Sequence, residues 1–263
     1  MGAALTVVGG GRMGTALVKG LLAGGRQPGT LMVVEADPAR RRTLGGEVPG
    51  VAVAEEAQEV TAAVVAVKPA DAQPACAALA AAGCRRALSI MAGVTLSQLE
   101  RWLPDAAVIR AMPNTPATVG AGISALAAGR AAGPDDVVWA REVLEAVGEV
   151  VEVAEAALDA VTGLSGSGPA YVFLVAEALI DAGVLVGLPR PLARSLALHT
   201  LAGSAALLLE SGAEPETLRA QVTSPGGTTA AGLRVLESAA VRSAFLEAVA
   251  AATERSRDLG MRG

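Results

Sequence analysis

Thr162-Gly-Leu-Ser-Gly-Ser-Gly-Pro-Ala-Tyr-Val-Phe173 is the stretch at which the sequence changes from one architecture to another. Before it, short Val- and Ala-rich runs alternate with helical patterns, and after it the pattern is helical only. Within it, Ser165–Gly168 supplies two hydroxyls and two residues without side chains, and Pro169 suits the first position of a helix. The stretch therefore predicts either a hinge with a helix cap or an anion site made of free backbone N–H groups.

The pattern before this stretch predicts a doubly wound, mostly parallel sheet, because strands alternate with helices. After an N-terminal strand and a second one at Leu31–Glu35, the expected strands are Val51–Ala54, Ala63–Val67, Ala87–Met91, Ala107–Met112, Gly122–Leu126 and Glu149–Val153. The helices expected between them include Asp71–Ala82, Thr95–Trp102, Pro134–Val147 and Glu155–Val161.

Five helices are expected beyond the central stretch: Pro169–Leu188, Pro191–Ser211, Pro215–Val222, Thr229–Ser238 and Val241–Leu259. The first is apolar nearly all round, apart from Glu177 and Asp181, so it must be covered on every side. Five helices in one chain do not supply enough cover, and we therefore expect an interlocked dimer. The lone His199 is expected to be a core or interface residue rather than a catalyst.

The N-terminus has the pattern of a dinucleotide-binding unit. The apolar run Ala4–Val8 is followed by Gly9-Gly-Gly-Arg-Met-Gly14 and then by a helical pattern. Gly9, Gly11 and Gly14 fit G-x-G-x-x-G, in which the glycines allow a tight turn, close approach of the backbone to a pyrophosphate, and close packing of helix on strand. Because the motif lies between a strand and a helix, it predicts a Rossmann-type cofactor site.

Glu35, at the end of the second strand, leaves the cofactor preference open. It lies 21 residues after the glycine motif, where an acidic side chain binds the ribose hydroxyls of NAD. Arg40–Arg42 nearby are suited to hold the 2′-phosphate of NADP through charge-assisted pairs. Asp37 is a second acidic candidate, or the cap of a helix that begins at Pro38.

Three loops at the carboxyl ends of expected strands are further candidates, because ligands bind at that edge of such sheets. They are Val67-Lys-Pro69, Met91-Ala-Gly93 and Met112-Pro-Asn-Thr-Pro116. Lys68, one of only two lysines, is either a ligand contact or a solvated loop residue. Asn114 stands between two prolines and is suited either to offer its amide to a carboxamide or to form an Asx-type turn.

The bulk composition favours a cytoplasmic protein with small core side chains. Apolar residues make up 52% of the sequence and aromatic residues only 2%, so the core is expected to be Ala, Val and Leu. The net charge of −5 and the lack of a basic cluster with interleaved aromatics argue against a nucleic-acid partner. Cys76 and Cys84 are expected to be reduced thiols, and no metal is expected.

No export signal or membrane partner is expected. Met1–Gly11 has no basic region ahead of its apolar run, unlike a signal peptide. Ala170–Leu188 is the most apolar helical stretch, but Glu177 and Asp181 interrupt it, so it is expected to be a buried helix rather than a membrane span.

Two segments carry a resemblance to a known family. Val161–Phe173, and the hydroxyl-rich segment Val222-Thr-Ser-Pro-Gly-Gly-Thr-Thr229, closely resemble pyrroline-5-carboxylate reductases of proline biosynthesis. The glycine motif, the three strand-end loops and Gly183–Pro189 match the same family in order, so the resemblance covers essentially the whole chain. The two hydroxyl-rich segments are specific, whereas many dehydrogenases share the glycine motif.

The resemblance implies a fold, an activity and an assembly. The fold is an α/β Rossmann N-terminal domain, over residues 1–161, with an all-α C-terminal dimerisation domain over 162–263. The activity is reduction of the C=N bond of 1-pyrroline-5-carboxylate to L-proline, the final step of proline biosynthesis. Hydride comes from NADPH, or alternatively NADH. Dimers of this family often assemble into a decamer.

The resemblance also implies site residues. Those expected at the cofactor are Gly9, Gly11, Arg12, Met13, Gly14, Lys68, Pro69, Ala92 and Asn114, to which the spacing argument adds Glu35. Those expected at the substrate are Ser165, Gly166, Ser167, Gly168, Thr228 and Thr229. Thr229 matches the hydroxyl that the family places near the ring nitrogen, and is the expected catalytic residue.

The residue types agree with imine reduction. The helical part has no lysine and one histidine, so it is poor in general acids, whereas reducing a ketone creates an alkoxide that needs a donor. An imine nitrogen can arrive already protonated. We expect the substrate carboxylate on the backbone N–H groups of Ser165–Gly168, Thr229 on the ring nitrogen, and catalysis mostly by positioning.

Two other classes stay open at this point. A small dehydrogenase acting on a β-hydroxy acid generally needs a lysine in the helical domain, and this chain has none there. A non-enzymatic dinucleotide-binding dimer, acting as a sensor or scaffold, has no need of the two hydroxyl-rich segments.

Overall fold

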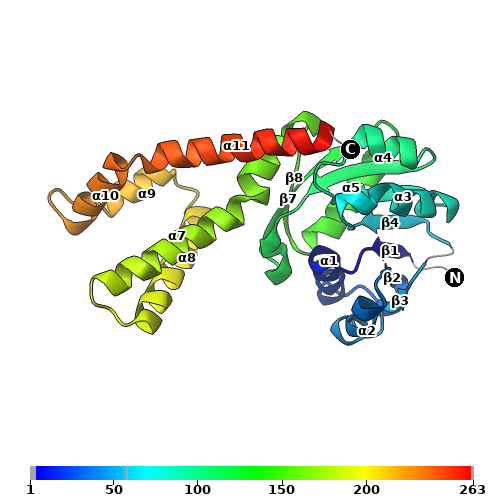
Figure 1. Ribbon diagram of the computed structural model, residues 1–263, viewed down its shortest axis with the longest axis horizontal. Helices are drawn as coiled ribbons and strands as arrows, with labels where there is room; N and C mark the ends of the chain where they lie inside the picture. The colour runs from blue at the N-terminus through cyan, green and yellow to red at the C-terminus, as the bar shows by residue number, and fades with distance from the viewer. Residues whose placement is uncertain (1–3, 57–58, 262–263) are drawn as a thin grey trace. The chain divides into compact units, whose positions relative to one another are not determined.

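The computed structural model describes residues 4–56 and 59–261, and the chain divides into two compact units (Figure 1). The first unit holds the chain up to Ser167 together with the residues from Ala250 onward, and the second holds Gly168–Val249. Compact units are defined by contacts and need not coincide with domains. The predicted domain boundary after residue 161 therefore stays a prediction.

The described part of the first unit contains an eight-stranded sheet with the order β3-β2-β1-β4-β5-β6-β7-β8. Its strands are β1 (Leu5–Val8), β2 (Leu31–Val34), β3 (Ala52–Ala54), β4 (Ala62–Val65), β5 (Arg86–Ser89), β6 (Ala107–Met112), β7 (Gly122–Ala128) and β8 (Gly148–Glu152). Neighbouring strands are parallel except β6 and β7, which pair antiparallel. The expected α/β fold with a mostly parallel sheet is confirmed.

Helices cover both faces of the sheet, because successive strand residues point to opposite sides. In β1, Leu5 and Val7 join one core and Val8 joins the other. The first core is covered by α1 (Arg12–Ala23), α2 (Pro38–Glu47) and α5 (Pro134–Glu145). The second is covered by α3 (Ala72–Ala81), α4 (Leu96–Trp102) and α6 (Leu158–Val161).

The strand order creates a switch point at β1, which lies between β2 and β4. The parallel strands β1, β2, β4, β5 and β6 end at the same edge of the sheet. The glycine motif, Glu35 and the three strand-end loops therefore follow strands that end at one edge, where open α/β sheets bind ligands.

The central stretch opens a helix as expected, but a π-helical turn that was not expected precedes it. α6 is followed by a π-helical turn, Thr162–Gly166, and then by α7 (Gly168–Leu185). The N–H of Ser167 donates to the carbonyl oxygen of Thr162 at 2.8 Å, so the prediction of a free run of N–H groups is wrong at this residue. Ser167, between the π turn and α7, keeps right-handed helical backbone angles (φ −84°, ψ −22°). Single π turns inside helices are frequent at functional sites.

The remaining elements are helical, as predicted: among the described residues 153–261 there is no strand. They are α7, α8 (Arg190–Ser211), α9 (Pro215–Gln221), α10 (Thr228–Ser238) and α11 (Val241–Met261). α11 passes from the second unit into the first, where Ser256 Oγ donates to Asp159 Oδ1 at 2.7 Å. The same end of α11 lies against Gly93, since a Cβ added there would be 3.4 Å from the Cβ of Leu259.

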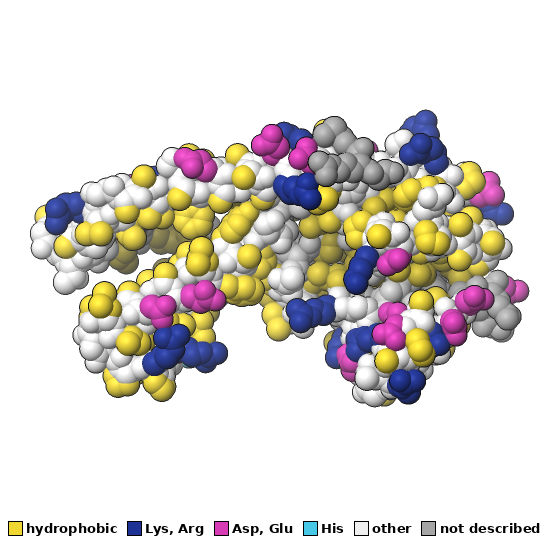
Figure 2. Space-filling view, viewed as in Figure 1, with side chains coloured by type: hydrophobic (Ala, Val, Ile, Leu, Met, Phe, Trp, Pro, Cys, Tyr) yellow, Lys and Arg dark blue, Asp and Glu magenta, His cyan; other side chains and the backbone are white. Residues whose placement is uncertain are grey.

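The helices of the second unit leave much of their apolar surface uncovered in this chain (Figure 2). Leu185 is 87% exposed and Leu209 85% exposed, while the buried apolar residues of this unit are Ala176, Ile180, Ala193 and Ala197. Two helical stretches, Glu155–Leu185 and Arg190–Ser211, are long and apolar enough to cross a membrane by length and composition alone, which is weak evidence for a span. Apolar patches of this kind also mark surfaces that a partner chain covers.

Candidate active site

A cavity of about 910 Å³ lies beside the carboxyl ends of β1, β2 and β4. Gly9 and Gly11 line it at the end of β1, Glu35 at the end of β2, and Lys68 after β4. One wall comes from α3, through residues such as Pro74. Its volume is typical of a cavity for a small ligand or cofactor.

The three glycines of the motif have different roles. The fold requires glycine at Gly9 and Gly14, whereas at Gly11 only a ligand would require it. Gly9 has φ +105°, and a Cβ there would lie 2.6 Å from the carbonyl oxygen of Ala66. A Cβ on Gly14 would overlap the carbonyl oxygen of Gly9. By contrast, a Cβ on Gly11 would meet nothing within 4 Å. Gly11 therefore leaves open space beside the cavity, where the backbone can approach a ligand.

The residues present fit the pyrophosphate of a dinucleotide. α1 begins at Arg12 with Gly11 as its cap, so its first N–H groups lack partners within the helix and favour an anion. Met13 packs its side chain against the core, which leaves only its backbone for a ligand. Arg12 lines a second cavity, of about 480 Å³, together with Lys19.

Glu35 is held in place by two backbone N–H groups. Its carboxylate accepts from Gly10 N at 2.8 Å and from Asp37 N at 2.9 Å. Asp37 itself caps α2, accepting from Ala39 N at 2.8 Å, so its capping interpretation is confirmed. The acidic side chain predicted at the end of the second strand therefore faces the cavity in a fixed orientation.

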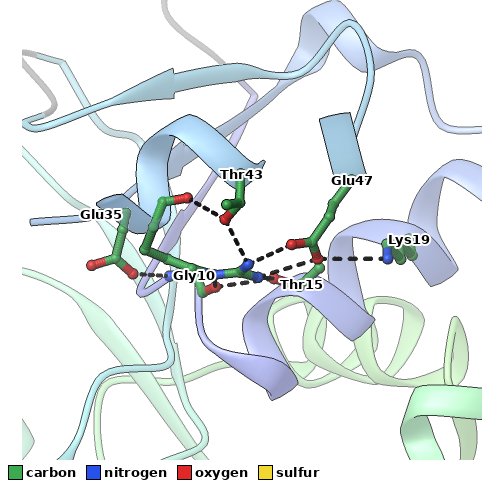
Figure 3. A network of polar contacts seen from close by, with 7 residues as sticks. Gly10, Thr15, Lys19, Glu35, Thr43 and Glu47 are labelled. Atoms are coloured by element: carbon green, nitrogen blue, oxygen red, sulfur yellow. Dashed lines mark hydrogen bonds and ion pairs between the residues drawn. The ribbon is translucent and has the colours of Figure 1, made fainter. Parts of the chain in front are cut away.

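An ion pair lies next to this carboxylate (Figure 3). Arg40 and Glu47, both on α2, form a short charged hydrogen bond. This hydrogen bond raises the pKa of Arg40 and lowers the pKa of Glu47. Lys19 adds a second cation 3.7 Å from Glu47. The pair is thus kept fully charged near neutral pH.

The strand-end loops are placed at the expected edge but differ in exposure. Lys68 and Pro69 are exposed, and Lys68 lines the cavity. Ala92 is half-buried in the loop after β5. Asn114 is buried, with 9% of its surface exposed.

Asn114 uses its amide within the fold, which neither of its sequence-based interpretations anticipated. Its Nδ2 donates to the carbonyl oxygen of Ser165 at 3.2 Å, and its Oδ1 accepts from Ile123 N at 3.0 Å. No local signal reveals this contact, because Ser165 lies 51 residues away in the sequence.

The π turn lies against the loop that follows β6. A Cβ on Gly166 would come within 2.7 Å of Met112 Cε, so the turn packs closely on the flexible end of the Met112 side chain, which would have to shift for a larger residue. Ser165 Oγ donates to the carbonyl oxygen of Val161 at 3.0 Å. Ser167, which follows the π turn, is half-buried. The structure thus brings Asn114, Ser165 and Gly166 together.

Thr228 and Thr229 open a helix in the second unit. α10 begins at Thr228 with Gly227 as its cap, and the N–H of Ala231 bonds to the carbonyl oxygen of Gly227. The N–H groups ahead of Ala231 therefore have no partner within the helix and can bind an anion. Thr229 is half-buried.

A part-buried ion pair between Arg110 and Glu155, just ahead of α6, was not expected from the sequence. Arg110 on β6, whose side chain is 7% exposed, donates to Glu155 at 3.0 Å. The same carboxylate oxygen accepts from Leu96 N at 2.7 Å. Glu155 therefore joins β6 and α4 to the segment that leads into α6. Its long sequence separation from Arg110 hid the pair.

His199 is exposed on α8, where its Nδ1 lies 2.8 Å from the carbonyl oxygen of Ser195. Among residues 4–56 and 59–261, no group of three or more His, Cys, Asp or Glu is arranged to hold a metal ion.

Two family models match the chain. Residues 155–259 match pyrroline-5-carboxylate reductase dimerisation, and residues 4–93 match NADP oxidoreductase coenzyme F420-dependent. The helical part is therefore a dimerisation domain, which accounts for the uncovered apolar faces of its helices. The first match confirms the expectation of a dimer.

Relatives match the chain over nearly its full length. A pyrroline-5-carboxylate reductase of Synechocystis sp. is 48% identical, covering 97% of this chain and 98% of its own. The enzyme of that name from Mycobacterium tuberculosis is 46% identical, covering 98% of this chain and 97% of its own.

Solved structures agree. A pyrroline-5-carboxylate reductase of Coxiella burnetii has a TM-score of 0.90 and 34% identity, covering 98% of this chain and 99% of its own. The Plasmodium falciparum enzyme with NADP bound has a TM-score of 0.85 and 29% identity, with 97% of each chain covered. A scaffold or a β-hydroxy acid dehydrogenase does not account for these matches. The chain belongs to the pyrroline-5-carboxylate reductase family, the NAD(P)H-dependent oxidoreductases that its two hydroxyl-rich segments resemble.

Proposed function

We propose that this chain reduces 1-pyrroline-5-carboxylate to L-proline with hydride from NAD(P)H, as the final step of proline biosynthesis. The observation that carries the proposal is the full-length match to reductases of that name. The cavity beside the glycine loop supports it, since the reaction needs a dinucleotide.

The cofactor residues have distinct tasks in this proposal. Gly9 and Gly14 shape the turn, while Gly11, Arg12 and Met13 offer backbone N–H groups to the pyrophosphate. Glu35 accepts from the adenosine ribose. The residues proposed for the ribose and nicotinamide region are Lys68, Pro69, Ala92 and Asn114. When bound, the cofactor supplies the hydride.

The substrate residues come from the two hydroxyl-rich segments. We assign the substrate carboxylate to the N-terminus of α10, at Thr228 and Thr229, rather than to the backbone of the π turn. The reason is that the N–H of Ser167 already bonds to Thr162, whereas the first N–H groups of α10 have no partner in their helix. The turn Ser165–Gly168 then bounds the substrate through the hydroxyl of Ser167 and its small residues.

Catalysis in this proposal depends on positioning. Thr229 is the catalytic residue, and its hydroxyl accepts a hydrogen bond from the protonated ring nitrogen, which becomes the amine of proline. Since that nitrogen arrives with its proton, the chain needs no general acid in its helical part. Holding hydride donor and acceptor in line can lower the barrier by up to roughly 7–11 kcal/mol.

Two further properties are proposed: a higher oligomer built from dimers, and a location in the cytoplasm. The dimer is expected to assemble into a higher oligomer such as a decamer, and the protein is expected to be cytoplasmic, without a membrane or nucleic-acid partner. The exposed apolar residues of α7 and α8 are then interface residues. Sedimentation of the purified protein measures the oligomer, and fractionation of the cells that make it measures the location.

The direct test is loss of reduced-cofactor absorbance with pyrroline-5-carboxylate, run in parallel with NADPH and NADH. Turnover that yields proline supports the proposal. A protein that binds a dinucleotide but turns over neither would instead be a sensor or a reductase of another imine. Protection against thermal unfolding by proline in the presence of cofactor separates these two outcomes, because a ligand that binds only the folded state raises its stability.

A further inference from the structure

The carboxylate of Glu35 is fixed on the cavity wall with capacity left for a ligand. One of its two oxygens accepts the backbone N–H of Gly10 at 2.8 Å (Figure 3). The other accepts the backbone N–H of Asp37 at 2.9 Å. A carboxylate has about four acceptor positions, so roughly two remain. Hydroxyl groups of a ribose can donate to them, whereas a phosphate cannot.

Arg40 has no N–H group free to bind a phosphate. A guanidinium has five donors, and each one of Arg40 already has a partner. Nε donates to Gly10 O at 2.7 Å, and Nη1 donates to Thr43 Oγ1 at 3.0 Å and to Glu47. Nη2 donates to Thr15 Oγ1 at 3.0 Å and to Glu47 Oε2 at 3.2 Å. Binding a 2′-phosphate would break at least one of these bonds, and the charge of Arg40 is already balanced by Glu47.

Arg41 and Arg42, the other two arginines of this run, are not placed to bind the 2′-phosphate in place of Arg40. Arg41 donates from Nη1 to the carbonyl oxygens of Glu35 and Ala36, both at 2.7 Å, and from Nη2 to Glu55 at 2.9 Å. Arg42 is exposed and is not among the described residues that line the cavity.

The charge around the cavity opposes a further anion. Among the described residues of its lining, the acidic ones are Glu35, Asp37, Glu55, Glu56 and Asp71, and the basic ones are Arg40 and Lys68. A phosphate monoester adds a charge of about −1.5 to −2 at neutral pH. Beside Glu35, that charge would meet a lining in which, among the described residues, five acidic ones outnumber two basic ones, so it is repelled.

We propose that Glu35 makes this chain select NADH over NADPH, with Arg40 held by Glu47 rather than available to the 2′-phosphate. The proposal rests on the proposed use of a nicotinamide dinucleotide and names the residue that chooses between the two. It resolves the conflict that the sequence left open between the acidic residue and the three arginines.

The first test is binding without substrate. The dissociation constants of NADH, NADPH, ADP-ribose and ADP-ribose 2′-phosphate are measured by calorimetry on the full-length protein. We expect the two ligands without the 2′-phosphate to bind at least about tenfold more tightly than their phosphorylated counterparts. Equal or tighter binding of the phosphorylated ligands overturns the proposal, and this comparison needs no variant.

The second test assigns the selectivity to Glu35. Glu35→Gln keeps an acceptor for Gly10 but removes the charge, so the NADPH-to-NADH ratio of dissociation constants should fall at least about fivefold. Asp71→Asn is the matched control, since it removes the same charge from another wall of the cavity, and should change the ratio less than about twofold. Equal changes in the two variants overturn the role of Glu35. Thermal unfolding without ligand verifies that both variants fold.

These outcomes are distinct from failure of the proposed function. A protein that binds NADH selectively but reduces no pyrroline-5-carboxylate overturns the proposed function and leaves the selectivity standing. A protein that reduces pyrroline-5-carboxylate faster with NADPH, and binds NADPH more tightly, overturns the proposed selectivity and leaves the proposed function standing. Binding of neither dinucleotide overturns both.

Discussion

The side-chain amide of Asn114 donates to the backbone carbonyl of Ser165 at 3.2 Å, joining the loop after β6 to the π turn. Its oxygen accepts from Ile123 N, at the start of β7. One buried side chain therefore fixes three segments that are distant in the sequence. Because Ser165 belongs to the proposed substrate turn, Asn114 links the shape of that turn to the sheet.

Asn114→Ala is expected to destabilise the protein by about 1–2 kcal/mol, since it removes two part-buried hydrogen bonds, to Ser165 O and from Ile123 N. Turnover should also fall, because the Ser165 turn loses its anchor. Urea unfolding measures the first effect and steady-state kinetics the second. Thr118→Ala is the control: it removes one exposed hydrogen bond of the adjacent turn and should change stability by less than about 0.5 kcal/mol. Similar losses in the two variants would contradict this role of Asn114.

Gly14→Ala and Gly11→Ala are expected to fail in different ways. A Cβ at Gly14 overlaps the carbonyl oxygen of Gly9, so this variant should lose about 2 kcal/mol or more of stability. A Cβ at Gly11 meets nothing within 4 Å, so the variant should fold normally yet bind the dinucleotide at least about tenfold more weakly. Thermal unfolding without ligand and calorimetric titration separate the two effects. A Gly11→Ala protein with normal cofactor affinity would exclude close approach of the ligand at that residue.

Thr229→Ala is expected to lower kcat about ten- to hundredfold while leaving cofactor affinity nearly unchanged, because the hydroxyl is proposed to act only on the substrate. Thr223→Ala is a matched control in the same segment, since its hydroxyl already donates to Arg219 O at 2.6 Å. An unchanged rate at saturating substrate in Thr229→Ala would remove this residue from the mechanism.

Glu155→Ala should destabilise the protein more than Arg110→Met. The Arg110 side chain is 7% exposed and would be left buried without its partner, at a cost of about 2–3 kcal/mol. Glu155, with its side chain 35% exposed, can be hydrated when Arg110 is removed, and we expect a loss of about 1 kcal/mol. Glu155→Gln keeps an acceptor for Leu96 and should fall between them. The reverse order in urea unfolding would show that the Arg110 site admits water.

Cys76 and Cys84 should resist alkylation in the native protein. Burial raises the pKa of Cys76 from 9.0 to about 11 and also raises the pKa of Cys84. At pH 8 this lowers the thiolate fraction of Cys76 about a hundredfold. Iodoacetamide labelling followed by mass spectrometry should therefore give little product natively and complete labelling in urea. Rapid native labelling would contradict the burial.

The raised pKa of Cys76 also makes the stability of the folded protein depend on pH. The folded protein keeps the Cys76 proton at a pH where the unfolded chain releases it. Its contribution to stability is therefore fully present below pH 9.0 and is lost as the pH rises towards about 11. Cys76→Ala should show a shallower decline of the unfolding free energy across this window.

Much of the first unit could be predicted because its signals are local. The strand Ala107–Met112 was expected with the bounds that the structure gives, and the other elements differ by a few residues at their ends. Apolar runs bounded by glycine or proline define such strands whatever surrounds them. The edge at which the glycine motif, Glu35 and Lys68 gather follows from the parallel order of the strands.

The rest depended on contacts between distant residues. Nothing in the local pattern shows that Gly166 packs on Met112, or that the chain stays helical through Ser165–Gly168. The partners of Arg40 include Thr15, 25 residues earlier. A run of arginines predicts positive charge, but the structure decides whether that charge is available to a ligand.

The path of α11 has a consequence for how the chain can be made and cut. Residues 250–261 of this helix complete the first unit, where Ser256 bonds to Asp159, yet they are synthesised after the whole of Gly168–Val249. On the ribosome, the first unit therefore waits for its final helix until the second unit has emerged. In the laboratory, no single truncation yields either unit whole: isolating the first requires residue 167 to be joined to residue 250 by a new linker.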